Sequence, residues 1–372
     1  MGQERHVLKV HTGEEVLELY AYQLDKAKTV LYYALTVCTL GLFRLLLHWK
    51  PDWYIKVRAS RCAHGVAHYI NVIDEHGVEA FRPIRQHTVS SDGVIPHIPT
   101  GNGTMQRVDV IRYFTFRKLK YIWKSDLEEW VSPAELDSQI PLKHFHSVLE
   151  SGTGLPDEEV KCRRVTYGWN LIDVKLKPIL VLLFIEAISP FYIFQVFSVS
   201  IWFSDNYEYY ASIIVIISQE KKLRSMVQSS NDVEVLRADG IKTISSEGLV
   251  PGDVIIVPAH GGLMQCDAVL MNGTAIVNES MLTGESVPIT KVALTAVHDD
   301  DEEECFSFEK HSKHILYCGT HVLQTRFYHG KQVKAIVLRT AYSTLKGQLV
   351  RSIMYPKPID FRFTKDLFRS MF

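Results

Sequence analysis

One long apolar stretch constrains this chain more than any other feature of its sequence. Between Pro178 and Phe203 the only charged residue is Glu186. As an α-helix these 26 residues would extend for roughly 39 Å, more than the ~30 Å hydrocarbon core of a bilayer. A polar turn and a second apolar run follow, and basic residues flank the pair on both sides. We therefore predict an amphipathic helix and a transmembrane helical hairpin over residues 171–225, with both ends in the cytosol.

The second arm of this predicted hairpin is short. Residues 207–218 would form roughly 18 Å of helix, which is less than a bilayer requires. The sequence therefore leaves open whether residues 207–218 span the membrane.

A second apolar segment, Thr29–Trp49, lies near the N-terminus. It is barely long enough to span a bilayer, contains Gly41, and is basic on both sides. Such flanks favour a segment that enters the cytosolic leaflet and returns, although a single span with Arg44 reaching the interface stays open. We predict a re-entrant membrane segment at residues 29–49, inside an N-terminal region of residues 1–60. Its basic residues also predict attraction to anionic lipid.

Composition argues against some classes of function. The 372 residues include 41 basic and 42 acidic side chains, a net charge of −1, which gives no sign of nucleic-acid binding. No two of the six cysteines lie within five residues of each other, so no thiolate metal site is predicted. The acidic run Asp299–Glu304 is interpreted as a solvated loop, because adjacent carboxylates alone do not form a metal cage.

The rest of the sequence indicates two β-rich regions. Alternating apolar and polar residues between turns predict a cytosolic β-rich domain over residues 61–170. Residues 226–350 contain short β-branched runs separated by turn residues, which predicts a compact jelly roll or sandwich. The predicted strands of this second region are Val233–Arg237, Ile241–Ile244, Val254–Val257, Ala268–Met271, Ala275–Asn278, Ile315–Tyr317, His321–Gln324 and Lys334–Thr340.

The stretch NESMLTGESVPITK, Asn278–Lys291, lies inside the second β-rich region. TGES within a small β domain that follows an apolar hairpin resembles the actuator domain of P-type ATPases. The resemblance extends to VPGDVIIVP, CDAVLMNG, YCGTHVLQT and KGQLVRSI, which occur in the family's order. YGWN, PFYIFQVFSVSIWFSDNYEYY and MYPKPIDF are similar to the type V, B subgroup. Members of that subgroup include lysosomal and endosomal polyamine transporters, and they carry an N-terminal re-entrant membrane element.

The resemblance implies a fold and a function. The fold would be a multi-domain membrane protein with the re-entrant helical element, a small β-rich domain, the transmembrane hairpin, and an all-β actuator domain, a distorted jelly roll, at residues 226–350. The function would be that of an ATP-driven cation or polyamine transporter. The resemblance further implies the use of ATP and Mg²⁺ by the full-length protein, and a multi-pass location in late endosomal or lysosomal membranes.

The resemblance also assigns the catalytic residues. P-type ATPases pass through an aspartyl-phosphate, a covalent intermediate whose hydrolysis needs an oriented water molecule. Glu285 would activate that water, and Thr283 and Gly284 would shape the tip of the loop. Ser286 would hold the loop through a hydrogen bond.

The family's phosphorylated aspartate lies in a D-K-T-G-T motif, which does not occur in this sequence. We therefore expect the N-terminal part of a transporter, whose own residues bind no nucleotide and no metal. Its tail, residues 351–372, would lead to a missing third main helix. The alternative is a truncated, non-catalytic, membrane-anchored fragment that binds lipid or partners and regulates the full-length pump.

Overall fold

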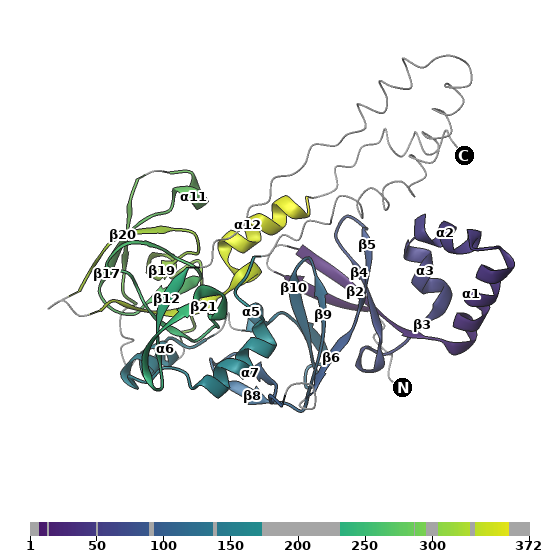
Figure 1. Ribbon diagram of the computed structural model, residues 1–372, viewed down its shortest axis with the longest axis horizontal. Helices are drawn as coiled ribbons and strands as arrows, with labels where there is room; N and C mark the ends of the chain where they lie inside the picture. Colours follow the sequence, from purple (N-terminus) through teal and green to yellow (C-terminus); the bar gives the residue numbers. More distant parts are fainter. Residues whose placement is uncertain are drawn as a thin grey trace, which may run out of the picture. The chain divides into compact units, whose positions relative to one another are not determined.

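The computed structural model describes residues 7–12, 15–49, 51–88, 93–136, 140–172, 231–285, 287–294, 304–327 and 332–356 (Figure 1). They belong to two compact units. The first unit contains the described parts of Met1–Gln23, Ser60–Leu171 and Ser230–Phe372. The second contains the described parts of Leu24–Ala59 and Ile172–Ser229.

Two antiparallel sheets form the C-terminal part of the first unit (Figure 1). The six-stranded sheet has the order β13-β12-β14-β21-β16-β19, and the four-stranded sheet has the order β15-β20-β17-β18. All eight predicted strands are confirmed to within two residues, and β15 and β18 are additional. The bounds are β12 (Asp232–Arg237), β13 (Gly240–Ser245), β14 (Val254–Ile256), β15 (His260–Leu263), β16 (Asp267–Leu270), β17 (Thr274–Asn278), β18 (Ile289–Val292), β19 (Ile315–Leu316), β20 (His321–Arg326) and β21 (Lys334–Arg339).

The core of this part lies between the two sheets. Successive side chains of a strand point to opposite faces, so alternate residues of the six-stranded sheet face the four-stranded one. In β21, Ala335 and Val337 join a buried apolar cluster that includes Ala275 and Val277 of β17. The two sheets are therefore packed face to face, which agrees with the sandwich predicted from the sequence.

The opposite face of the six-stranded sheet is also buried. Ile336 and Leu338 of β21 lie in a second apolar cluster with Leu142 and Phe145. These last two side chains come from α6 (Leu142–Glu150), a helix inside the region predicted as a β-rich domain. A sheet covered on both faces explains why the strands β14 and β16 consist of buried residues throughout.

The N-terminal part of the first unit contains three further antiparallel sheets. Their orders are β1-β2-β4-β5, β11-β10-β9-β6 and β7-β8. The strands are β1 (Val7–Thr12), β2 (Glu15–Leu24), β3 (Ala59–Arg61), β4 (Tyr69–Ile73), β5 (Glu79–Pro83), β6 (Arg85–Thr88), β7 (His97–Pro99), β8 (Met105–Arg107), β9 (Val110–Phe116), β10 (Leu119–Lys124) and β11 (Glu129–Val131).

Three short helices complete the first unit beside α6. They are α5 (Pro133–Leu136), α7 (Asp157–Tyr167) and α12 (Leu345–Met354). Single 3-10 turns lie at His64–Val66, Ser246–Gly248, Ser312–His314 and Ala341–Ser343, and the four-residue α11 (Ser280–Thr283) follows β17.

The described part of the second unit is helical. It comprises α1 (Lys26–Cys38), α2 (Leu42–Trp49) and α3 (Pro51–Arg58). Asp25 caps α1 by accepting the N–H of Ala27 at 2.9 Å, and the chain breaks at Leu40 and Gly41, where φ is 51° and 89°. The segment predicted to be re-entrant is thus two helices joined by a left-handed turn. Its placement in a membrane stays a prediction.

The predicted fold class is wrong in its transmembrane helical hairpin. No helix within the described ranges combines the length and apolar character needed to cross a bilayer. The apolar helix α1, for example, has 13 residues and is only about 20 Å long. The hairpin was predicted at residues 171–225, and from residue 173 onward these lie outside the described residues. The described structure is instead rich in β strands, including the all-β region around the TGES stretch.

Candidate functional site

The TGES stretch forms a loop between β17 and β18, which pair antiparallel with Val277 opposite Ile289 (Figure 1). The loop begins with α11, whose first backbone N–H, from Ser280, is accepted by the Asn278 side chain at 2.9 Å. Gly284 ends α11 in the left-handed conformation, with φ of 79°. Glycine adopts this conformation without the penalty that a β-carbon brings. The sequence SMLTG therefore specifies one helical turn and a sharp reversal.

The Thr283 hydroxyl connects the two ends of this turn. It donates to the carbonyl oxygen of Glu279 at 3.2 Å and accepts the backbone N–H of Glu285 at 3.2 Å. One hydroxyl can do both, because it has one donor hydrogen and two acceptor lone pairs. The backbone on both sides of the reversal is therefore fixed by a single side chain.

The Glu285 side chain is exposed on this fixed turn. Two apolar side chains of the same loop are also exposed, Met281 at 71% and Val287 at 69%. Thr283, Gly284 and Glu285, three of the predicted site residues, form this turn, and their catalytic role stays a prediction. Ser286, the fourth predicted site residue, lies outside the described residues.

A buried ion pair lies at the base of the loop. The Nζ of Lys291, in β18, is 2.8 Å from Oε1 of Glu279, and the two side chains are 5% and 6% exposed. The same Nζ donates to the carbonyl oxygen of Ser312 at 3.1 Å and lies 4.9 Å from the centre of the Tyr317 ring. The ammonium group thus has polar or aromatic partners from three separate segments, which compensates its removal from water.

The loop is a projection rather than a pocket. A cavity of about 1240 Å³ is lined by residues of α6 and α7 and by Pro251 and Gly252, and Thr283, Gly284 and Glu285 do not line it. Among the residues that the structure describes, no group of three or more His, Cys, Asp or Glu side chains is arranged to hold a metal ion. Among the described residues, Glu285 is therefore an exposed carboxylate that lies outside this cavity.

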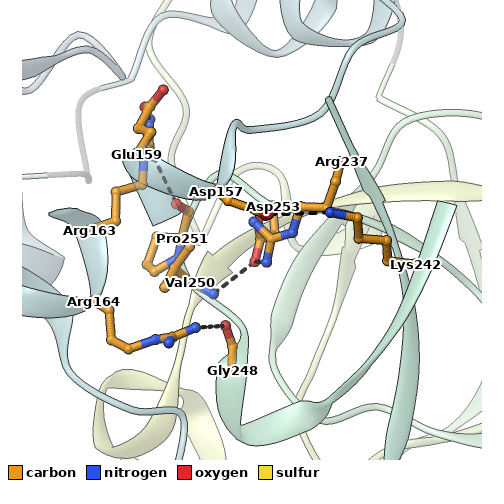
Figure 2. Close-up of polar contacts among 10 residues, drawn as sticks. All are labelled: Asp157, Glu159, Arg163, Arg164, Arg237, Lys242, Gly248, Val250, Pro251 and Asp253. Atoms are coloured by element: carbon orange, nitrogen blue, oxygen red, sulfur yellow. Dashed lines mark hydrogen bonds and ion pairs between the residues drawn. The ribbon is translucent and has the colours of Figure 1, made fainter. Parts of the chain in front are cut away.

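The helix α7 is attached to the two-sheet sandwich by charged side chains (Figure 2). Arg163 donates one hydrogen bond to the carbonyl oxygen of Pro251 at 2.8 Å. Its Nη2 donates a second one to Oε1 of Glu159 at 2.6 Å. Arg164 donates to the carbonyl oxygen of Gly248 at 3.2 Å. Both arginines lie on the last two turns of a helix whose first turn is acidic, a distribution that suits the helix dipole.

A buried pair lies beneath this contact (Figure 2). Arg237 and Asp253 are joined by a bidentate contact of 2.6 and 3.2 Å, with side chains 4% and 0% exposed. Asp253 also accepts the N–H of Val250 at 3.0 Å. Burial raises the pKa of Asp253 to about 6, and the Arg237 guanidinium and the Val250 N–H oppose that shift.

Asn170 anchors the segment that follows α7. Its amide nitrogen donates to the carbonyl oxygens of Ser246 at 2.9 Å and Gln265 at 3.0 Å, and its amide oxygen accepts the N–H of Ala341 at 2.7 Å. These partners lie at least 76 residues away in the sequence. Because α7 and Asn170 bind to several parts of the sandwich, residues 157–170 are an integral part of its fold.

Asp267 is a second buried carboxylate, and it joins three elements. Its two oxygens accept the N–H groups of Cys318 at 2.8 Å and Leu345 at 2.9 Å. Asp267 thereby ties the start of β16 to the end of β19 and to the first residue of α12. Burial raises the pKa of Asp267 to about 6, although these two hydrogen bonds lower it.

A two-sheet sandwich with an exposed TGES turn defines the actuator class of domain in P-type ATPases. The family model of the P-type ATPase actuator domain matches residues 227–354. The model of the P5-type ATPase cation transporter matches residues 13–124, and that of the cation transporter/ATPase N-terminus matches residues 137–202. Family models of P-type ATPases thus match three separate parts of the chain, one of them specific to the P5 type, and these matches confirm the resemblance predicted from its sequence.

Relatives align with almost the whole chain. The probable cation-transporting ATPase catp-6 of Caenorhabditis elegans is 52% identical over 99% of this chain and 30% of its own length. The cation-transporting ATPase catp-5 of the same organism is 43% identical over 96% of this chain and 31% of its own length. The polyamine-transporting ATPase 13A3 of Macaca fascicularis is 38% identical over 99% of this chain and 34% of its own length. The chain thus spans about a third of the length of these relatives.

Several residues of the site were not predicted from the sequence. Glu279 and Lys291 belong to the quoted motif, but no pattern within it indicated that they form a pair. The strand that contains Lys291, β18, was itself not predicted, so no partner for this side chain was indicated. Asn170 lies within YGWN, yet its partners are too distant in sequence to be read from local patterns.

Proposed function

We propose that Glu285 orients and deprotonates the water that hydrolyses an aspartyl-phosphate in a P5-type cation transporter. The observation that carries this proposal is the pair of hydrogen bonds made by the Thr283 hydroxyl. They fix the turn, while the Glu285 carboxylate stays exposed. A fixed and accessible carboxylate is suited to a substrate that arrives on another domain. Thr283 and Gly284 would hold the geometry of the turn, and Ser286 would assist them.

The chemistry is a phosphoryl transfer to water. The water oxygen forms a bond to phosphorus, and the bond between phosphorus and the aspartyl oxygen breaks. The water proton passes to the Glu285 carboxylate, and the aspartate leaves as a carboxylate. General-base assistance of this kind contributes on the order of 10²–10⁴-fold to a rate. ATP, which the family uses together with Mg²⁺, would supply the phosphoryl group through other parts of the complete transporter.

The transported substrate is proposed to be a polyamine or another organic cation, and the compartment a late endosomal or lysosomal membrane. Support comes from the name of one relative, polyamine-transporting ATPase 13A3, and from the resemblance of YGWN and MYPKPIDF to the type V, B subgroup. Uptake of labelled polyamine and of inorganic cations by vesicles that contain the complete transporter tests the choice of substrate. Transport of inorganic cations alone would contradict it.

The helical unit is proposed to bind anionic lipid. Val30, Leu31, Val37, Leu40 and Leu42 are exposed apolar side chains, and the exposed basic residues of α1 and α2 are Lys26, Lys28 and Arg44. Flotation of the chain with anionic and with neutral liposomes tests this role. Equal binding to anionic and neutral liposomes would contradict a preference for anionic headgroups. The alternative function, a non-catalytic fragment that regulates the pump, stays a prediction.

The test of the catalytic role is the decay of the phosphoenzyme in the complete transporter that carries Glu285→Gln. Glutamine keeps the size of the side chain and removes its basicity. We expect the phosphoenzyme to form from ATP and then to persist.

A further inference from the structure

We propose that the buried pair of Glu279 and Lys291 positions the Glu285 turn for its reaction. This inference rests on the proposed function of Glu285. Neither residue reaches the reacting atoms, since both side chains are almost completely buried below the loop. Their role is to fix where the loop begins.

Lys291 is held in one position by its contacts. Its ammonium group contacts the Glu279 carboxylate, the Ser312 carbonyl and the Tyr317 ring. Lys291 itself belongs to β18, where it lies opposite Ala275 of β17. A charge with several partners from separate segments has little freedom to move, so Lys291 is a rigid support.

Glu279 connects the position of Lys291 to the turn. Its carboxylate is bound to Lys291, and its carbonyl oxygen accepts the N–H groups of Leu282 at 2.9 Å and of Thr283 at 3.0 Å. The same oxygen accepts the Thr283 hydroxyl, which in turn holds the N–H of Glu285. A continuous series of contacts therefore runs from Lys291 through Glu279 and Thr283 to the backbone of Glu285.

The ion pair of Glu279 and Lys291 constrains the geometry at the base of the loop. A buried ion pair is often no more stabilising than apolar side chains of the same volume, but it requires one specific geometry. Separating the carboxylate from the ammonium group would leave both charges buried without their main partner, which costs more than a shift between two apolar side chains. Misplacement of a reacting group by about 1 Å can cost on the order of 10²-fold in rate. We therefore assign the pair the role of positioning the Glu285 turn.

The first arm of the test measures hydrogen exchange of the loop amides in the 372-residue chain. In Glu279→Gln and in Lys291→Met we expect the amides of Thr283 and Glu285 to exchange at least about tenfold faster, because their acceptors are no longer held. The double variant E279Q/K291M removes the uncompensated charge. It should recover thermal stability relative to Lys291→Met while its loop amides still exchange rapidly.

A matched control separates position from stability. Asp253→Asn weakens another buried ion pair of the same sandwich, that of Arg237 and Asp253. It should lower the unfolding temperature and leave the loop amides unchanged. Equal acceleration of the loop amides in Asp253→Asn and in Glu279→Gln would overturn the proposal, because the loop would then report only global stability.

The second arm measures decay of the phosphoenzyme in the complete transporter. Glu279→Gln and Lys291→Met should slow the decay by about 10- to 100-fold, and Asp253→Asn should not. Wild-type decay in Glu279→Gln together with slow decay in Glu285→Gln would overturn the positioning role and leave the proposed function intact. Wild-type decay in Glu285→Gln would overturn the proposed function itself, and the positioning role with it.

Discussion

The hydroxyl of Thr283 accepts the backbone N–H of Glu285 at 3.2 Å and leaves the Glu285 carboxylate uncovered. The constraint therefore acts on the main chain and not on the group that is proposed to react.

Replacement of the hydroxyl tests this constraint. In Thr283→Val both hydrogen bonds of the side chain are lost, at about 1 kcal/mol each. We expect faster exchange of the Glu285 amide and a decay of the phosphoenzyme that is slower by about tenfold in the complete transporter. Thr283→Ser keeps the hydroxyl and serves as the control. If Thr283→Val and Thr283→Ser behave alike, the hydroxyl does not hold the turn.

The left-handed conformation of Gly284 leads to a second prediction. No atom lies within 4 Å of the position that a β-carbon would take, so Gly284→Ala meets only backbone strain. That strain costs about 1–2 kcal/mol and is relieved if the turn opens. Gly77 has a similar φ, 74° against 79°, and equally open surroundings. Gly77→Ala should lower stability by a similar amount without slowing the decay of the phosphoenzyme, whereas Gly284→Ala should slow it.

The buried carboxylate of Asp267 makes stability depend on pH. Its pKa is about 6 in the folded chain, whereas aspartate in an unfolded chain has a pKa of about 3.9. Between these values the folded chain retains a proton that the unfolded chain releases. The free energy of unfolding should therefore fall as pH rises from about 4 to 6, by up to about 3 kcal/mol from this group.

The variant Asp267→Asn isolates that contribution. Asparagine does not titrate, so the variant should lose part of the pH dependence between pH 4 and 6. It also has one acceptor oxygen where Asp267 offers two, and one of the N–H groups of Cys318 and Leu345 would face an NH₂ group. We expect a loss of about 1–3 kcal/mol. Urea unfolding at several pH values measures both effects. An unchanged pH profile would show that Asp267 does not titrate in this range.

Asn170 is predicted to contribute strongly to stability. Its amide makes three hydrogen bonds to backbone groups of the sandwich, and Asn170→Ala leaves those groups without this partner. We expect the free energy of unfolding to fall by about 2–4 kcal/mol. The exposed Asn102 provides the control, since Asn102→Ala should change stability by less than about 0.5 kcal/mol. Equal effects of the two variants would contradict the role of Asn170 as an anchor.

Local patterns were sufficient for most of the sandwich. The predicted strands have β-branched residues between turn residues, and these preferences act over a few neighbours. The strand β15 was missed because Gly261 and Gly262 occupy half of it, and glycine weakens the strand pattern. The turn of Thr283, Gly284 and Glu285 was predicted through its resemblance to a family. The Thr283 hydrogen bonds that fix the turn were not.

Contacts between distant segments were not accessible in this way. The helix α6 lies within residues 61–170, which were predicted as a β-rich domain, yet its Leu142 and Phe145 complete the core on the outer face of the six-stranded sheet. An amphipathic helix shows which of its faces is apolar, but not which surface that face will cover. The partners of Lys291 at Ser312 and Tyr317 follow from the folding of the sandwich, and no spacing within the motif indicates them.

The central claim is that Glu285 activates the hydrolytic water. The most direct measurement is the rate of phosphoenzyme decay in the complete transporter, compared between the wild type, Glu285→Gln and Glu234→Gln. Glu234 is an exposed glutamate on β12 of the same domain, and its replacement should change nothing. We predict that Glu285→Gln still forms phosphoenzyme and loses it about 10²–10⁴-fold more slowly, a rise of about 3–5 kcal/mol in the barrier. Decay of Glu285→Gln at the wild-type rate would contradict the account.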